Sequence, residues 1–149
     1  MSEALRFETI VVPTDFSPAA EKALELAAQL ARQAGPAKLL LVNAYAVPLE
    51  LEALAIYGAK QVYEELAAES DKQLKEILER LRKEGVSAES MGNHGRPEDV
   101  IVELARERKA DLIVMGTHGR TGLPHVLLGS VAERVIRNAP CPVITVKKF

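Results

Sequence analysis

Short runs of consecutive apolar residues recur along the chain, and runs of this kind are typical of strands buried on both faces of a parallel sheet. They predict strands over residues 9–12, 38–44, 112–115 and 143–146. A fifth run, at 86–91, is interrupted by polar residues and predicts a weaker strand, which we expect near an edge of the sheet. The pattern therefore indicates a five-stranded sheet.

Between these runs, apolar residues recur every three or four positions, which is the period of a helix with one buried face. The first helix is expected to begin after Ser17, a typical N-cap residue followed by proline, and to end at Gly35. Further helices are predicted over residues 59–83, 97–109 and 131–137.

Two segments lack either pattern. Residues 45–58 contain a proline and scattered apolar positions, and we predict a loop with a single helical turn there. Residues 92–96 contain two glycines directly before the proline that opens a helix, and they predict a second glycine loop. The other connections are short.

Strands and helices alternate along the whole chain, which predicts the α/β class: one domain with an open five-stranded parallel sheet and helices on both faces. A chain of 149 residues fits a single domain and is long enough to bury a sizeable core. No internal repeat or low-complexity linker divides it.

Composition and charge exclude several classes of function. A net charge of −2 and an aromatic content of 4% do not provide the positive charge and the aromatic side chains that nucleic acid binding uses. The single cysteine, Cys141, cannot form an intrachain disulfide and suits a reducing compartment. No apolar run is long enough to span a membrane, and no signal-peptide pattern opens the chain. We therefore expect a cytoplasmic protein.

The candidate site lies after the fourth predicted strand, where Gly116 and Gly119 interrupt the apolar run. Gly129-Ser130 then precedes the last predicted helix. Glycine lets the backbone take a positive φ, which we expect in this loop, and it lets a ligand approach the backbone closely. The N-terminus of a helix offers unpaired N–H groups and a positive dipole end. Our hypothesis is that this loop binds the phosphates of a nucleotide, although neither G-x-G-x-x-G nor G-x-x-x-x-G-K-[ST] is present.

The spacing Gly116-x2-Gly119-x9-Gly129-Ser130 resembles the ATP-binding loop of the universal stress protein family. The opening Val-Val-Pro-Thr-Asp-Phe-Ser (11–17) and the closing Ala-Pro-Cys-Pro-Val-Ile-Thr-Val (139–146) extend the resemblance over nearly the whole chain. It implies a Rossmann-like nucleotide-binding domain over residues 1–149 with strand order 3-2-1-4-5. It also implies ATP bound across the ends of the first and fourth strands.

The same resemblance implies part of the nucleotide site. The residues that would contact the phosphates and ribose are Gly116, Gly119, Gly129, Ser130 and Val131. The adenine side would include Ala44, or Val42 if the register is shifted by two residues. The position of Asp15 directly after the first strand separately indicates that it could bond the ribose or help to hold Mg²⁺, and its structural alternative is to cap the turn in which it lies. Together with the residues at the ends of the first and fourth strands, the predicted contacts are Pro13, Thr14, Asp15, Ala44, Met115, Gly116, His118, Gly119, Arg120, Gly129, Ser130 and Val131.

Several of these residues have a structural alternative. Ser130 could bond a phosphate oxygen and also be the N-cap of the last helix. His118 and Arg120 could neutralise phosphate charge, but His118 could equally order the loop and Arg120 could be exposed. His94 and His125 have no partner at metal-ligand spacing, so a transition-metal site is not expected.

The chemistry of catalysis is largely missing from the sequence. No nucleophile elbow or kinase-type catalytic loop is found, and the lysine and Mg²⁺-binding hydroxyl of P-loop enzymes are absent. Cys141 is flanked by prolines and is expected to pack rather than to react. We therefore predict a nucleotide-binding regulatory module. Two alternatives stay open: a slow ATP hydrolase in which Asp15 positions Mg²⁺ and water, and a nucleotide-free interaction module.

The last predicted strand, 143–146, is short, apolar and close to the C-terminus, which places it at an edge of the sheet. Natural proteins cover or pair an apolar edge, because an open one invites uncontrolled association. The family resemblance implies a homodimer paired across this strand. The competing interpretation is a monomer whose edge is protected by Lys147 and Lys148.

Overall fold

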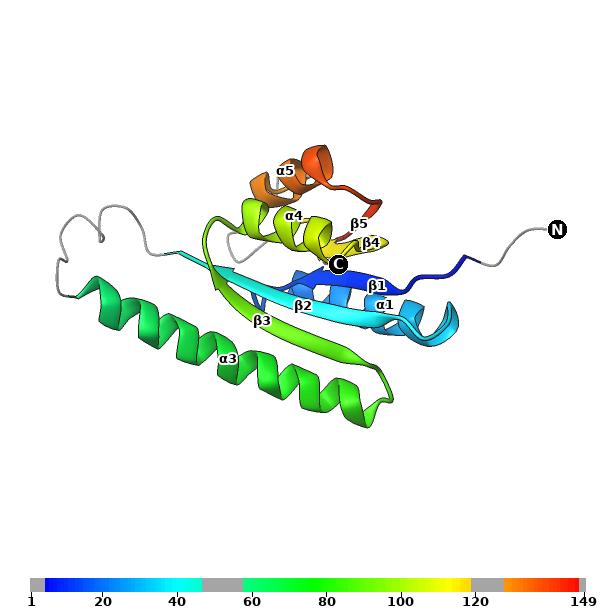
Figure 1. The fold of residues 1–149 in the computed structure, drawn as a ribbon, viewed down its shortest axis with the longest axis horizontal. Helices are drawn as coiled ribbons and strands as arrows, with labels where there is room; N and C mark the ends of the chain where they lie inside the picture. The colour runs from blue at the N-terminus through cyan, green and yellow to red at the C-terminus, as the bar shows by residue number, and fades with distance from the viewer. Residues whose placement is uncertain (1–4, 47–57, 119–127, 148–149) are drawn as a thin grey trace.

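The computed structural model describes residues 5–46, 58–118 and 128–147 (Figure 1). Strands and helices alternate along these residues. The strands are β1 (Thr9–Pro13), β2 (Lys38–Tyr45), β3 (Ala88–His94), β4 (Leu112–Gly116) and β5 (Val143–Val146). The helices are α1 (Pro18–Gln33), α3 (Ala59–Lys83), α4 (Pro97–Glu107) and α5 (Ser130–Asn138).

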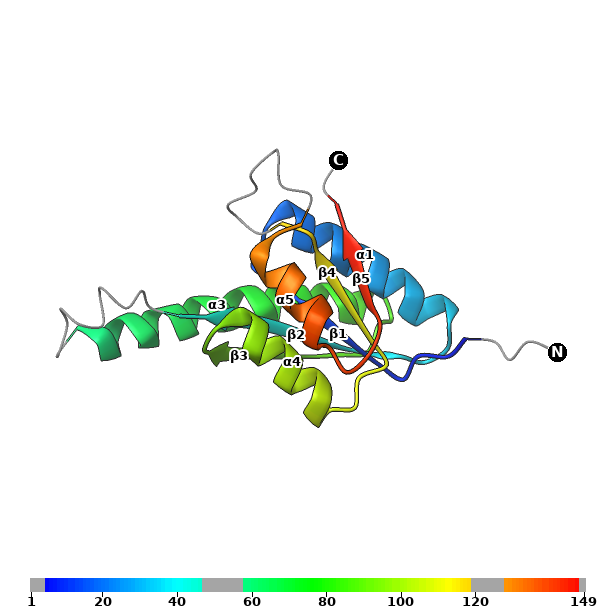
Figure 2. The same cartoon turned by 90° about the horizontal axis from the view of Figure 1, so that it is seen from above.

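All neighbouring strands are parallel, and the sheet has the order β3-β2-β1-β4-β5, which confirms the predicted fold class and strand order. Helices α1 and α3 cover one face and α4 and α5 cover the other (Figures 1 and 2). Within β1, Ile10 and Val12 face α1 and α3, whereas Val11 faces α4 and α5. Helices cover both faces of the sheet, which is why the central strands β1, β2 and β4 contain long apolar runs.

Helix α1 begins as the sequence predicts. Ser17 is its N-cap, its hydroxyl oxygen accepts a hydrogen bond from the backbone N–H of Ala20 at 3.2 Å, and Pro18 is the first helical residue. The buried face consists largely of alanines such as Ala23 and Ala27, neither of which is exposed. Because these side chains are short, the helix lies close to the sheet.

Strand β3 differs from the prediction. It extends through Gly92 to His94, so the glycine loop expected over 92–96 is wrong for these residues. A Cβ built on Gly92 would lie 2.7 Å from the hydroxyl oxygen of Ser70, so glycine here lets α3 pack closely on the strand. Gly95, with φ +146°, lies in the turn that follows. As predicted, β3 is an edge strand.

Other element ends differ by a few residues, the usual spread at the ends of helices and strands. The sequence predicts that β1 ends before Pro13, but Pro13 is its last residue and pairs with Val42. Gly129 is the N-cap of α5, so the prediction of Ser130 as N-cap is wrong. The loop predicted over 45–58 falls mostly outside the described residues. Across the described residues, every helix is too short or too polar to cross a bilayer.

Candidate functional site

The carboxyl ends of β1 and β4 lie next to each other, as the sequence predicts, because these strands are hydrogen-bonded neighbours. The chain leaves β1 toward α1 on one face of the sheet, and it reaches α5 on the other face after β4. The direction of winding therefore reverses between these two strands. In open parallel sheets, ligands bind beyond the strand ends at such a point.

The turn from β1 into α1 is held by its own side chains. The Thr14 hydroxyl oxygen accepts a hydrogen bond from the backbone N–H of Phe16, and Oδ1 of Asp15 accepts one from that of Ser17, both at 3.0 Å. The structural role expected for Asp15 is therefore present. A half-buried Asp15 still lies at the strand end where the ligand role requires it.

Thr117, directly after β4, joins three parts of the site. Its backbone N–H donates to the carbonyl of Val146 in β5 at 3.0 Å, and its carbonyl accepts from the backbone N–H of Gly129 at 2.7 Å. Its side chain is buried. Thr117 was not among the predicted site residues. The sequence signal that could have identified it is a hydroxyl side chain between Gly116 and His118, directly after a buried strand. Thr117 therefore ties the start of α5 and strand β5 to the end of β4.

The two described glycines of the predicted loop allow close contacts between backbones. Gly116 lies against α1, where an added Cβ would be 3.0 Å from Cβ of Ala19 and 3.1 Å from its carbonyl carbon. An added Cβ on Gly129 would be 2.7 Å from the carbonyl oxygen of Thr117. Neither glycine has a positive φ, so that part of the expectation is wrong. A side chain at Gly129 would therefore require the backbone to shift, and one at Gly116 would require the start of α1 to move by a few tenths of an ångström.

The first turn of α5 faces the same strand ends. The Gly129 carbonyl accepts the first helical hydrogen bond, from Glu133, and no described side chain caps the helix. Ser130 is exposed as the first helical residue, whereas Val131 is half-buried against the core. The N–H groups of an uncapped first turn can bind an anion.

The remaining predicted site residues occupy different environments. Pro13 and Met115 are buried, and Met115 is part of the core under α4 and α5. Ala44 is half-buried near the end of β2, whereas its alternative, Val42, is a core residue with 1% exposure. Nδ1 of His118 lies 3.0 Å from the Thr117 hydroxyl, which agrees with a role in ordering the loop. Gly119 and Arg120 lie outside the described residues.

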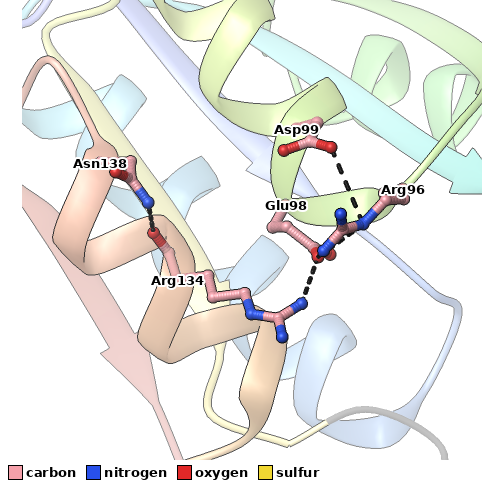
Figure 3. Close-up of polar contacts among 5 residues, drawn as sticks. All are labelled: Arg96, Glu98, Asp99, Arg134 and Asn138. Carbon is pink, nitrogen blue, oxygen red and sulfur yellow. Dashed lines mark hydrogen bonds and ion pairs between the residues drawn. The ribbon is translucent and has the colours of Figure 1, made fainter.

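Beside the start of α5, an ion cluster that the sequence did not reveal joins this helix to α4 (Figure 3). Oε1 of Glu98 accepts hydrogen bonds from Arg96 at 2.7 Å and from Arg134 at 2.6 Å. Burial disfavours the charged form of Glu98, but hydrogen bonds from its own backbone N–H and from both guanidinium groups outweigh it. The pKa of Glu98 therefore lies below its ordinary value.

Glu98→Gln is expected to lower the free energy of unfolding at pH 7 by about 1–2 kcal/mol, a range kept small because both arginines are partly exposed. The lowered pKa means that the contribution of Glu98 is complete above its ordinary value of 4.5 and is lost as the pH falls through the folded-state value. Urea unfolding at several pH values should show the wild type and the variant converging in acid.

The matched control is Glu133→Gln, which removes an exposed ion pair with Arg137 at 2.8 Å. That pair connects residues one turn apart on α5 and should be worth only about 0.3–0.5 kcal/mol. If both variants lose equal stability at pH 7, Glu98 does not link the two helices energetically.

Cys141 is half-buried and packs against the core under α4 and α5. Burial, and to a lesser extent the nearby carboxylate of Asp111, raise the pKa of the Cys141 thiol. A raised pKa keeps the thiol protonated at neutral pH, which agrees with packing rather than nucleophilic chemistry. Among the described residues, no three His, Cys, Asp or Glu side chains are grouped so as to hold a metal ion.

Comparison with known proteins agrees with this architecture. The model of the universal stress protein family matches residues 6–147. Universal stress protein MJ0531 of Methanocaldococcus jannaschii is 39% identical over 143 residues, which cover 95% of this chain and 83% of that protein. The solved structure of hypothetical protein MJ0577 from the same organism has a TM-score of 0.87 at 30% identity and covers 97% of this chain and 99% of that one.

A third relative is a universal stress protein crystallised in complex with cAMP. It has a TM-score of 0.68 and 31% identity, and the match covers 97% of this chain and 100% of that one. The family match spans nearly the whole sequence, and the similar structures share its fold from end to end. This chain belongs to the universal stress protein family.

Proposed function

We propose that this protein binds an adenine nucleotide, ATP with Mg²⁺, at the adjacent ends of β1 and β4, and that it acts as a nucleotide-dependent stress-response or regulatory module. The observation that carries the proposal is the meeting of three elements at this point. The Asp15 turn follows β1, Thr117 follows β4, and the start of α5, which no described side chain caps, is bonded to Thr117. The cAMP complex of a relative supports an adenine nucleotide as the ligand.

The residues present suit such a ligand. The N–H groups of Ser130 and Val131 belong to the first turn of α5, where they could bind phosphate oxygens. Asp15 provides a carboxylate at the neighbouring strand end, which could bond ribose hydroxyls or hold Mg²⁺. Ala44 or the end of β1 would contact the base. The bound cation would neutralise part of the phosphate charge.

Two measurements test the proposal. Protein purified without added nucleotide would be denatured and its supernatant analysed for adenine nucleotides. Calorimetric titration would then measure the affinity for ATP with and without Mg²⁺, and GTP would serve as the control ligand. We expect ATP to bind and GTP to bind more weakly. ADP accumulating with time would favour the slow hydrolase, and the absence of binding would favour the nucleotide-free interaction module.

Asp15→Asn separates the two roles of this residue, because the amide oxygen can still accept the hydrogen bond from Ser17. Loss of the charge should weaken ATP binding by about 1–3 kcal/mol with little change in melting temperature. Asp15→Ala should weaken binding similarly and also lower the melting temperature, since it removes the turn hydrogen bond. If both variants keep wild-type affinity by calorimetry, Asp15 only structures the turn.

We also infer a homodimer joined through β5, which is an edge strand in the structure. Its four residues are only half-buried, and Ile136 on the adjacent α5 is 45% exposed. Half-exposed apolar residues along an edge strand favour pairing with a second copy. The family resemblance supports the same arrangement.

The register of β5 selects the variant that tests the dimer. Because Ile113 and Thr117 donate to Pro142 and Val146, alternate residues of β5 face β4, and the N–H of Thr145 faces outward. Thr145→Pro should therefore give a monomer, since it removes an outer donor but leaves the β4 ladder intact. Light scattering after gel filtration should show twice the 16.2 kDa chain mass only for the wild type.

Ile144→Pro is the contrasting variant, because the N–H of Ile144 faces β4. It should lower stability as well as disturb any assembly. A wild-type mass of one chain would contradict the dimer, and a Thr145→Pro variant that stays dimeric would place the interface elsewhere.

A further inference from the structure

The turn that contains Asp15 begins at Thr14, which is hydrogen-bonded to the neighbouring strand β2. Thr14 lies just beyond the end of β1, and its backbone N–H donates to the carbonyl of Val42 in β2 at 2.8 Å. Its carbonyl accepts a hydrogen bond from the side-chain amide of Asn43, also in β2, at 2.9 Å. Strand β2 therefore fixes both backbone polar groups of Thr14, one through its main chain and one through a side chain.

The conformation of Phe16, which follows Asp15, shows why these two hydrogen bonds to Thr14 matter. Phe16 has φ +64°, a left-handed conformation that bulky residues rarely adopt. Such a conformation costs of order 1–3 kcal/mol and persists only where the surroundings enforce it. Here Phe16 packs against the core, and its N–H is bonded to the Thr14 hydroxyl. The turn thus holds a strained shape between a fixed Thr14 and the cap of α1.

Asn43 is a polar residue in an otherwise apolar strand. It has 9% exposure, and the preceding residues Leu39 to Val42 belong to the two cores. An apolar residue would fill the same volume without the cost of burying an amide. Instead, the side-chain amide of Asn43 donates a hydrogen bond to the Thr14 carbonyl, a group that the β1–β2 ladder does not bind.

We propose that Asn43 is a positioning residue of the nucleotide site: by holding the Thr14 carbonyl, it sets the main chain that presents Asp15 to the ligand. The proposal rests on the proposed function, since Asp15 needs a defined place only if it contacts a nucleotide. Asn43 itself lies on the side of the sheet covered by α1 and α3, and it acts through the turn.

A double-mutant cycle tests this role. ATP affinity would be measured by calorimetry for the wild type, Asn43→Leu, Asp15→Asn and the double variant. Asn43→Leu should weaken ATP binding about tenfold, the effect of one lost buried hydrogen bond. In the Asp15→Asn background the same change should weaken binding less than about threefold, because the group that Asn43 positions is already altered.

Asn138→Leu is the matched control. It also removes a hydrogen bond from a side-chain amide to a main-chain carbonyl, that of Arg134 at 2.9 Å, but at an exposed position near the C-terminal end of α5 (Figure 3). ATP affinity should not change in this variant. If Asn43→Leu does not fold, Asn43→Asp keeps the shape of the side chain, lacks the amide donor and enters the same cycle.

Wild-type affinity in the Asn43 variant, or an equal loss in both Asp15 backgrounds, would overturn the positioning role. In the second case Asn43 affects the fold generally. A wild-type protein that binds no ATP would overturn the proposed function itself. If the wild type binds ATP and the Asn43 variant binds it equally well, only the positioning role fails.

Discussion

Gly116→Val is expected to lower the free energy of unfolding by about 2–3 kcal/mol, the range for forcing extra volume into a packed interior. The first atom of the new side chain would lie 3.0 Å from Cβ of Ala19 and 3.1 Å from its carbonyl carbon. The second of these is a main-chain atom in the first turn of α1, so relief requires the helix itself to move. Urea or thermal unfolding of the purified variant gives the measurement.

A compensating change provides the control for Gly116. Gly116→Ala alone should be less harmful than valine, and combining it with Ala19→Gly should recover part of the loss. Recovery should be incomplete because the carbonyl carbon of residue 19 stays in place. If Gly116→Val unfolds at the wild-type denaturant concentration, α1 does not limit the space at this position. ATP affinity in the variant is expected to fall together with stability.

Gly129→Val is expected to weaken ATP binding at least about 100-fold, equivalent to about 2.8 kcal/mol. An added Cβ would lie 2.7 Å from the Thr117 carbonyl oxygen, which accepts the hydrogen bond from Gly129 itself. The contact and the hydrogen bond cannot both persist, so the start of α5 must shift away from the end of β4. Phosphate groups held by that helix start would then lose their position relative to Asp15.

Calorimetric titration measures this effect, and circular dichroism shows whether the variant folds. Ser130→Ala is the matched control, because Ser130 is exposed and the substitution keeps the backbone N–H. It should weaken binding by less than about tenfold, or about 1.4 kcal/mol. A folded Gly129→Val variant with wild-type affinity would remove the start of α5 from the nucleotide site.

Much of the fold could be predicted because it depends on local patterns. The predicted helix at Ala59–Lys83 agrees with α3 in both its ends, and the cap of α1 at Ser17 is confirmed. The short apolar run at Val143–Val146 correctly indicated an edge strand. In each case, the period of apolar residues or a single capping residue carries the information.

The candidate site was less predictable because its details depend on contacts between distant residues. Thr117 is bonded to Val146 and Gly129, and nothing near Thr117 in the sequence indicates either bond. Glu98 and Arg134 likewise meet only because α4 and α5 pack side by side. The positive φ expected at Gly116 and Gly129 is wrong, and the structure instead shows close contacts with Ala19 and Thr117, residues far from them in the sequence or across the loop.

The main-chain bonds of Thr117 have a consequence for how this protein tolerates change. Its N–H reaches β5 and its carbonyl reaches the start of α5, so neither bond depends on the identity of a side chain. Substitutions along this connection that need no extra space leave it intact. A one-residue insertion between Gly116 and Thr117 would turn the wrong peptide groups toward both partners, since successive groups of an extended chain point in opposite directions. At this point, the protein should therefore tolerate a change of side chain more readily than a change in the number of residues.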